Sequence, residues 1–386
     1  MKTFLKWTFR TVLILTVVAA VGVAWKWTDI KRLLAVNSLF TEENIVRNFS
    51  NMDRMFFNTP IDLPEAEPYP LPAAPRDMPA GLDDWIAARS VTGLVVLKDG
   101  KTAYENYFLG TTPEDLRISW SVAKSYLSAL FGILLDEGAI DSIDDPVTKY
   151  APELAGSAYD GASIRNVLNM ASGVTFNEDY LDFKSDINRM GRVLAMGGSM
   201  DGFAAGLTGR DRPPGEAWQY VSIDTHVIGM VIRGATGRPI PELLGEKLLT
   251  PLRLEAAPYY LTDGNGVAFV LGGLNLRTRD YARFGLLFLN GGAVDGQQIV
   301  PRDWVIASTR PSAPTAPGET RYAFQWWVPA DNTEGEYFAR GVYGQYIYIN
   351  EPAGVVIAVN SADRGFREDG SYEQNLAMFR EITGAL

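Results

Sequence analysis

Four strand-like runs near the two ends of the main part of the chain constrain its fold more than any other feature of the sequence. These runs are Gly93–Lys98, Thr102–Tyr107, Tyr343–Asn350 and Val355–Asn360. Asp99-Gly100 separates the first two, and an Asp-Gly pair between strand-like runs predicts a hairpin. Residues from about 140 to 310 are richer in helical patterns. We therefore expect an α/β (α+β) fold in which an antiparallel sheet, built from both chain ends and flanked by helices, accepts a mainly helical insertion.

Four helices can be placed by their apolar spacing and their end signals. Ser119 is a good N-cap for a helix that ends at Gly138. The other three helices are expected at about Asp224–Ala235, at about Thr278–Leu289 and at about 371–383.

The first residues differ from the rest of the chain. Lys2, Lys6 and Arg10 precede an uncharged apolar run from Thr11 to Trp25, as in an export signal. The run is shorter than the roughly 20 residues of a full membrane span. Residues 1–29 therefore predict an uncleaved signal anchor or a cleaved signal peptide, with a buried helix as a third possibility. Either signal would make the protein exported and periplasmic, and an anchor would hold it at the inner membrane.

The remainder divides into a connector and a body. Residues 30–80 combine an amphipathic stretch with a proline-rich segment, and proline at this density prevents regular helix. We expect these residues to connect the membrane end to one large domain at 81–386 that contains the helical insertion.

The charge and the rare residue types exclude several classes of function. The net charge of −11 argues against a nucleic-acid partner, because phosphate binding needs a basic face. The chain has no cysteine and a single histidine, His226. A thiolate nucleophile is thus excluded and a zinc site is disfavoured. We expect no metal and no organic cofactor.

Two further groups of polar residues are given structural roles. A Ser-His-Asp triad would have to use His226, yet Gly197–Asp201 lacks the last glycine of the G-x-S-x-G elbow that such triads often use. Glu178, Asp179 and Asp182 are expected in a solvated loop rather than as a pair of catalytic carboxylates.

Ser121-Val-Ala-Lys124 is the main candidate for chemistry. Residues three apart share one face of a helix, so the lysine amine can lie beside the serine hydroxyl and act as its base. The motif is weak alone, but here it follows a strand pair and opens an amphipathic helix. Tyr220, two residues before Ser222, could share the proton transfers.

At this point the chain resembles the class C β-lactamase-like serine hydrolases, and within them the branch of the 6-aminohexanoate-dimer hydrolases and esterases. The segments that carry the resemblance are Arg117–Ser125, Ile164–Gly173, Phe176–Tyr180, Tyr220–Ser222, Gly272–Gly285 and Gly341–Gln345. They appear in order over nearly the whole body, so together they are far more specific than any one of them.

The resemblance implies the role of each residue. Ser121 would form an acyl-enzyme, Lys124 and Tyr220 would relay its proton, and the backbone N–H groups of Ser121 and Gln345 would form the oxyanion hole. The positions that would contact substrate are Tyr180, Ser222, Asn275, Tyr343 and Gly344.

One departure narrows the substrate. In β-lactamases and penicillin-binding enzymes, the segment that corresponds to Gly341–Gln345 carries a cationic side chain at the position where this chain has Val342. Arg340 would share a strand face with it and could still reach an acidic substrate. We expect carboxylic esters or small linear amides as substrates. The alternatives are a β-lactamase or D-alanyl-D-alanine peptidase activity, or a binding protein for cell-wall ligands without turnover.

Overall fold

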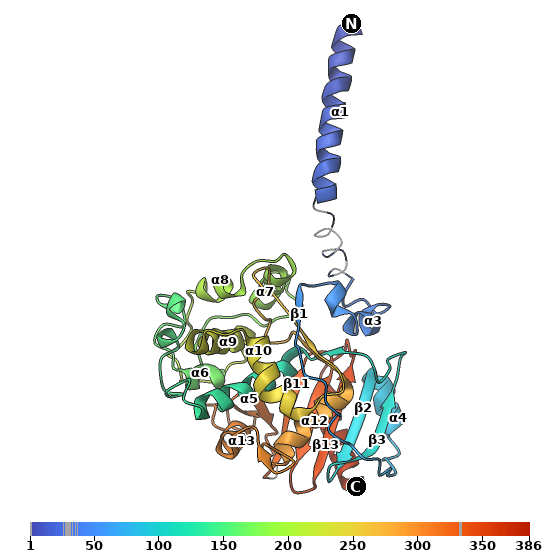
Figure 1. Ribbon diagram of the computed structural model, residues 1–386, viewed down its shortest axis with the longest axis vertical. Coiled ribbons are helices and arrows are strands. Elements are labelled where there is room, and N and C mark those ends of the chain that lie inside the picture. Colours follow the sequence, from blue (N-terminus) through green and yellow to red (C-terminus); the bar gives the residue numbers. More distant parts are fainter. Residues whose placement is uncertain are drawn as a thin grey trace.

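The computed structural model describes residues 2–25, 27, 32, 34, 36, 38–331 and 334–386. A seven-stranded antiparallel sheet runs in the order β3-β2-β13-β12-β11-β10-β9. Its strands are β2 (Val91–Lys98), β3 (Lys101–Tyr107), β9 (Arg321–Ala323), β10 (Trp326–Val328), β11 (Glu336–Gly341), β12 (Gln345–Asn350) and β13 (Val355–Ser361). The blue-green and red strands that lie together in Figure 1 come from opposite ends of the chain. The expected antiparallel sheet built from both ends is therefore confirmed.

Helices cover both faces of this sheet. The helices of the body are α3 (Ile45–Phe49), α4 (Leu82–Ala88), α5 (Ala123–Asp136), α6 (Ile164–Leu168), α7 (Asp186–Ala195), α8 (Met200–Ala205), α9 (Ser222–Thr236), α10 (Ile240–Leu244), α11 (Thr250–Leu252), α12 (Thr278–Leu289), α13 (Arg302–Thr309) and α14 (Ser371–Ala385). Side chains alternate along β2, because successive residues of a strand point to opposite faces. Val95 and Leu97 join the large core with α5 and α12, whereas Leu94 and Val96 join a smaller core with α4 and α14.

The hairpin and the later helices agree with the sequence. Asp99 and Gly100 between β2 and β3 both have positive φ, 50° and 75°, which a tight two-residue hairpin turn requires. The helix predicted at about Thr278–Leu289 is α12 with those bounds. The helix predicted from Asp224 begins two residues earlier, and Gly237 ends it with a φ of 69°.

The segment predicted as a connector is instead part of the body from residue 38 onward. A four-stranded sheet, in the order β1-β5-β6-β4, joins it to the insertion. Its strands are β1 (Asn58–Pro60), β4 (Arg117–Ile118), β5 (Tyr259–Leu261) and β6 (Leu274–Leu276). A separate two-stranded sheet consists of β7 (Ala293–Val294) and β8 (Gln297–Gln298). Leu39, Phe49 and Met52 are buried in the large core. Only the proline-rich part follows the surface, where Ala74 N–H donates to Thr102 O. Most of the preceding stretch, 28–37, lies outside the described residues.

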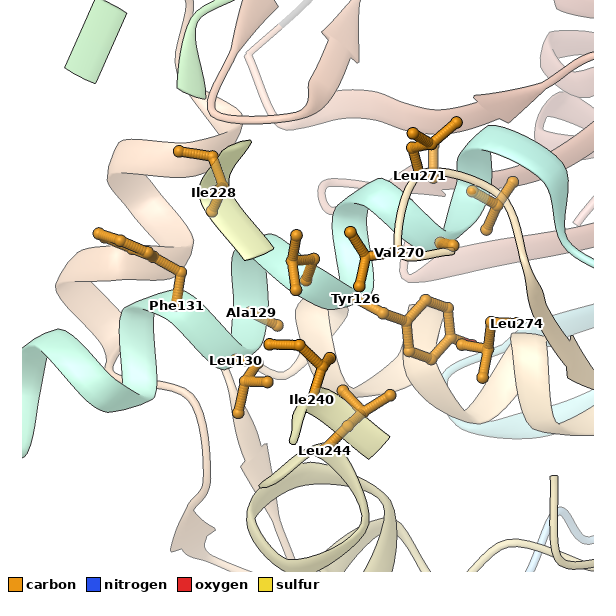
Figure 2. Packing of buried hydrophobic residues seen from close by; sticks show 14 of the residues in the cluster. Tyr126, Ala129, Leu130, Phe131, Ile228, Ile240, Leu244, Val270, Leu271 and Leu274 are labelled. Carbon is orange, nitrogen blue, oxygen red and sulfur yellow. The ribbon is translucent and has the colours of Figure 1, made fainter. Parts of the chain in front are cut away.

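α5 is the central helix of the large core. Every residue from Ala123 to Leu134 is buried, as in helices that are enclosed on all sides. Figure 2 shows Tyr126, Leu130 and Phe131 of α5 among side chains of α9, of α10 and of the segment before β6. The ring of Tyr126 also stacks on Phe284 of α12, with centroids 3.7 Å apart. α5 is thus fixed in position by packing from several elements.

The first helix, α1, covers Lys2–Trp25. Its large apolar side chains from Phe4 to Val21 are more than half exposed wherever they are described. Within the described part of the chain, no helix combines the length and the apolar character needed to cross a membrane.

Two glycines inside helices give a paired test of this packing. A Cβ at Gly132 of α5 would lie 2.2 Å from the Trp304 ring, whereas a Cβ at Gly191 of α7 would meet no heavy atom within 4 Å. We expect Gly132→Ala to lower the free energy of unfolding by about 1–3 kcal/mol through overpacking. Gly191→Ala should raise it by up to about 1 kcal/mol through helix propensity. Denaturant unfolding of both variants checks this, and equal effects would contradict the described packing of α5.

Candidate active site

Ser121 lies in a tight turn immediately before α5. The turn is the short 3₁₀ helix η2 (Trp120–Val122), and α5 itself begins only at Ala123. A helical segment thus begins next to Ser119 as predicted, but its first turn is 3₁₀, and the Ser119 side chain makes no capping hydrogen bond because its hydroxyl donates to Trp120 O. Trp120 has a φ of 43°, which is strained for a bulky residue. Such strain is common where a side chain has to be presented for function.

Lys124 is one turn further along the same backbone and is only 1% exposed. Its Nζ donates to the backbone oxygen of Ser222 at 3.2 Å and lies 5.4 Å from the centre of the Tyr220 ring. Burial lowers the pKa of Lys124 to about 7, against the attraction of Glu178 and Asp224. The amine can therefore lose its proton near neutral pH and accept one from a neighbour.

Tyr220 completes the group around the nucleophile. Its ring stacks on Trp327, with centroids 5.3 Å apart. Burial raises the pKa of Tyr220, and a hydrogen bond with the Ser121 side chain and the charge of Arg340 oppose that rise. The hydroxyl consequently stays protonated while it is hydrogen-bonded to Ser121, and the Lys124 Nζ lies over the ring of the same tyrosine.

Glu178 is a site residue that the sequence reasoning missed. It was expected in a solvated loop, but its carboxylate accepts hydrogen bonds from the backbone N–H of Ser222 and, at 3.2 Å, from the Ser222 hydroxyl. Burial raises the pKa of Glu178, while the hydrogen bonds of Ser222 and Tyr180 and the charge of Lys124 lower it. The sequence did contain one signal that Glu178 belongs to the site, because it lies in Phe176–Tyr180, one of the segments that carried the resemblance.

A second carboxyl lies beneath the site. Asp224 is fully buried in the first turn of α9, and its Oδ1 accepts from the hydroxyls of Tyr159 at 2.8 Å and Ser172 at 2.9 Å. Burial raises the pKa of Asp224 to about 7, although these two hydrogen bonds and Lys124 oppose the shift. This group ties α9 to the loop after α6, which holds Ser222 beneath Lys124.

The turn between β11 and β12 lies against the nucleophile. A Cβ added to Gly341 would be 2.7 Å from Ser119 O and 3.1 Å from Ser121 N, so only glycine permits this approach. Gln345 pairs with Gly341 across the turn. The Gln345 side chain donates to Ser361 O at 2.8 Å and to Tyr343 O at 3.0 Å, bracing the turn. Tyr343 and Gly344 both have positive φ there, so they form the turn rather than the start of the predicted strand.

Two cavities meet at Ser121, with volumes of about 420 and 450 Å³. Ser121, Tyr180 and Val342 line both of them. Ser222 and Tyr343 line the first cavity, and Tyr220 and Arg340 line the second.

The structure does not bring every expected contact residue to these cavities. Asn275 and Gly344 line neither of the two. Asn275 is fully buried in β6 between β4 and β5, where its side-chain amide donates to Gly273 O at 2.9 Å. The cleft position that the resemblance implied for Asn275 is therefore not seen in the two cavities at Ser121.

His226 lies apart from this group, in an ion-pair cluster. Its Nε2 is 2.7 Å from Asp201 Oδ1, which also accepts from Arg233 at 2.6 Å. Burial raises the pKa of Asp201, but His226 and Arg233 outweigh burial and lower this pKa to about 2. Among the described residues, no cluster of histidine and carboxylate side chains could hold a metal ion.

Comparison with known proteins agrees with this geometry. The family model described as Beta-lactamase matches residues 82–377. The chain is 34% identical over 279 residues to the 6-aminohexanoate-dimer hydrolase of Paenarthrobacter ureafaciens, covering 68% of this chain and 70% of that protein. The chain therefore belongs to the beta-lactamase family, and it is a serine hydrolase of that family.

Solved structures show the same fold. A candidate 6-aminohexanoate-dimer hydrolase from Bacillus anthracis superimposes with a TM-score of 0.80 at 22% identity, covering 89% of this chain and 95% of that one. A family VIII carboxylesterase superimposes with a TM-score of 0.58 at 14% identity, covering 82% and 99%.

Asp224 gives a test of the buried carboxyl. A carboxyl whose pKa is raised on folding stabilises the protein below its unfolded value of about 3.9, and that stability is lost as the pH rises through the folded value. We expect the wild-type protein to lose roughly 2–4 kcal/mol relative to Asp224→Asn between about pH 4 and pH 7. Denaturant unfolding of both proteins at pH 4.5 and pH 8 measures this difference. A difference that does not change with pH would show that Asp224 is ionised when folded.

Proposed function

We propose that the protein hydrolyses carboxylic esters or small linear amides through an acyl-enzyme on Ser121. The observation that carries the proposal is the buried Lys124 amine, one helical turn from a serine that is hydrogen-bonded to Tyr220. A serine becomes nucleophilic only beside a base, and a desolvated lysine can be that base.

The proposed reaction has two halves. Ser121 Oγ attacks the substrate carbonyl as its proton passes to the Tyr220–Lys124 pair. The N–H groups of Ser121 and Gln345 stabilise the oxyanion, each by about 2.7–4 kcal/mol. Tyr220 returns the proton to the leaving alcohol or amine. Water then attacks the acyl-enzyme, releasing the acid and restoring the serine hydroxyl.

Relatives support the substrate class, and the turn after β11 narrows it. The similar proteins include one named for an amide dimer and one named as a carboxylesterase. Val342 contributes no cation beside Ser121, which disfavours the alternative of a β-lactamase or peptidase that anchors a substrate carboxylate there. The alternative of a binding protein without turnover predicts no reaction at Ser121.

Labelling with a fluorophosphonate tests the proposal. We expect one adduct, mapped by mass spectrometry to Ser121 and absent from Ser121→Ala. Lys124→Met preserves the length of the buried side chain but removes the amine, so labelling should slow about 10²–10⁴-fold. Lys149→Ala is the matched control, because Lys149 pairs with Asp141 and Asp145 away from both cavities. No adduct, together with equal ester turnover by the wild type and Ser121→Ala, would contradict the proposal.

We also propose that the enzyme works outside the cytoplasm, with α1 at the inner membrane. The support is the basic start of the chain and the exposed apolar side chains that follow it in α1. Membrane fractionation and N-terminal sequencing of the native protein test this. An intact N-terminus in the membrane fraction indicates an anchor, and a new N-terminus near residue 25 in the periplasm indicates a cleaved signal. An intact protein in the cytoplasm contradicts both.

A further inference from the structure

The two cavities at Ser121 differ in chemistry. The first is lined mainly by aliphatic and aromatic side chains, among them Leu39, Phe40, Ile187, Met190 and Leu194. The second has the aromatic side chains of Trp327 and Phe366 in its wall but differs from the first in its many charged and hydroxyl groups, among them Arg340, Arg367, Glu368 and Tyr372. A substrate that spans Ser121 therefore has an apolar part on one side of its carbonyl and a polar part on the other.

One wall of the apolar cavity comes from Leu39, Phe40 and Phe56 of the segment 38–56, which precedes the part matched by the family model. Phe40 stacks on Tyr343 with ring centroids 4.9 Å apart and 12° between planes. Phe49 is buried and packs edge-on against Trp120 at 5.6 Å. The segment is thus attached both to the β11–β12 turn and to the residue before the nucleophile, which makes it a fixed wall.

Most of the other residues that line this cavity are also apolar. Helix α7 supplies its buried face, and Gly191 lines the cavity between those side chains. Leu181 and Phe183 line it while remaining 87% and 72% exposed. Exposed apolar side chains that continue an apolar cavity commonly mark a ligand-binding surface.

The position of Tyr220 decides which part of a substrate enters which cavity. Tyr220 lines the polar cavity and is not among the residues of the apolar one. A leaving group that takes a proton from Tyr220 must lie on its side of Ser121. The acyl chain then lies on the other side, against Phe40 and α7.

We propose that the acyl part of the substrate is an apolar chain of medium length, held in the cavity walled by the segment 38–56, and that the leaving group is polar. This proposal rests on the proposed function. Ser121 Oγ forms the new bond to the acyl carbon, the ester or amide bond breaks, and the alcohol or amine leaves with the proton. Water then releases the fatty acid.

Two isomeric esters test the orientation. Ethyl octanoate and octyl acetate have the same composition, but only the first carries its chain on the acyl side. Each buried methylene is worth about fourfold in rate, equivalent to about 0.8 kcal/mol. We expect kcat/KM to favour ethyl octanoate at least about tenfold. Equal rates, or a preference for octyl acetate, would overturn the proposal.

Variants of the cavity wall test its location. Phe40→Ala removes part of the wall, and Gly191→Phe places a ring in the cavity, because nothing else lies near a Cβ at that position. Each variant should lower the ratio of kcat/KM for ethyl octanoate to kcat/KM for octyl acetate at least about tenfold. Phe57→Ala is the matched control, since Phe57 directly follows the same segment and is 41% exposed, close to the 38% of Phe40, but does not line the cavity. An unchanged ratio in both wall variants would overturn the proposal.

A soluble ester and a membrane lipid could both supply such a chain. Monomeric octanoylglycerol and micellar dioctanoylphosphatidylglycerol separate the two sources. Turnover of either one supports the proposal and identifies the source, and turnover of neither contradicts it. If Ser121-dependent hydrolysis of p-nitrophenyl acetate occurs without any acyl-chain preference, the chain proposal fails and the proposed function stands. If neither an ester nor a small linear amide is turned over through Ser121, the proposed function itself fails.

Discussion

Burial of the Lys124 amine is the constraint on which the rest of the site depends. An ammonium with a single close backbone acceptor is costly in the interior, so the neutral amine is favoured and becomes a base. That environment exists only because α5 is enclosed on every side, by α9 and α10 and by α12 above the sheet. The extensive packing of this helix thus serves the chemistry as well as stability.

Three distant parts of the chain meet at the nucleophile, and polar contacts hold them together. The buried Arg117, four residues before Ser121, donates to Val46 O and to Ser50 Oγ, both at 2.7 Å. The N–H of Ser119 donates to Leu274 O. On the other side, Gly341 of β11 closes on the same turn. The N-terminal segment, the insertion and the last sheet strands therefore fix one short turn, which explains how a strained Trp120 is maintained.

The sequence predicted the features that depend on local pattern. The hairpin at Asp99-Gly100 and helix α12 follow from turn chemistry and apolar periodicity, and both were placed correctly. The packing of Leu39, Phe49 and Met52 into the large core could not be predicted in this way, because an amphipathic pattern shows that a segment has an apolar face and not what that face packs against. Glu178 was missed for a similar reason. Its acidic neighbours in the sequence indicate a solvated loop, and its hydrogen bond with the N–H of Ser222 depends on a contact between distant parts of the chain.

The most direct test of this account is the protonation state of Lys124. Lysine-specific ¹⁵N labelling of the full chain, with Lys124→Met to assign the signal, allows the side-chain amine to be titrated by NMR. The account predicts that this one amine titrates near pH 7 and is neutral at pH 8. An ammonium signal that persists to about pH 10, as for an ordinary lysine, would contradict the central claim that burial makes Lys124 the base for Ser121.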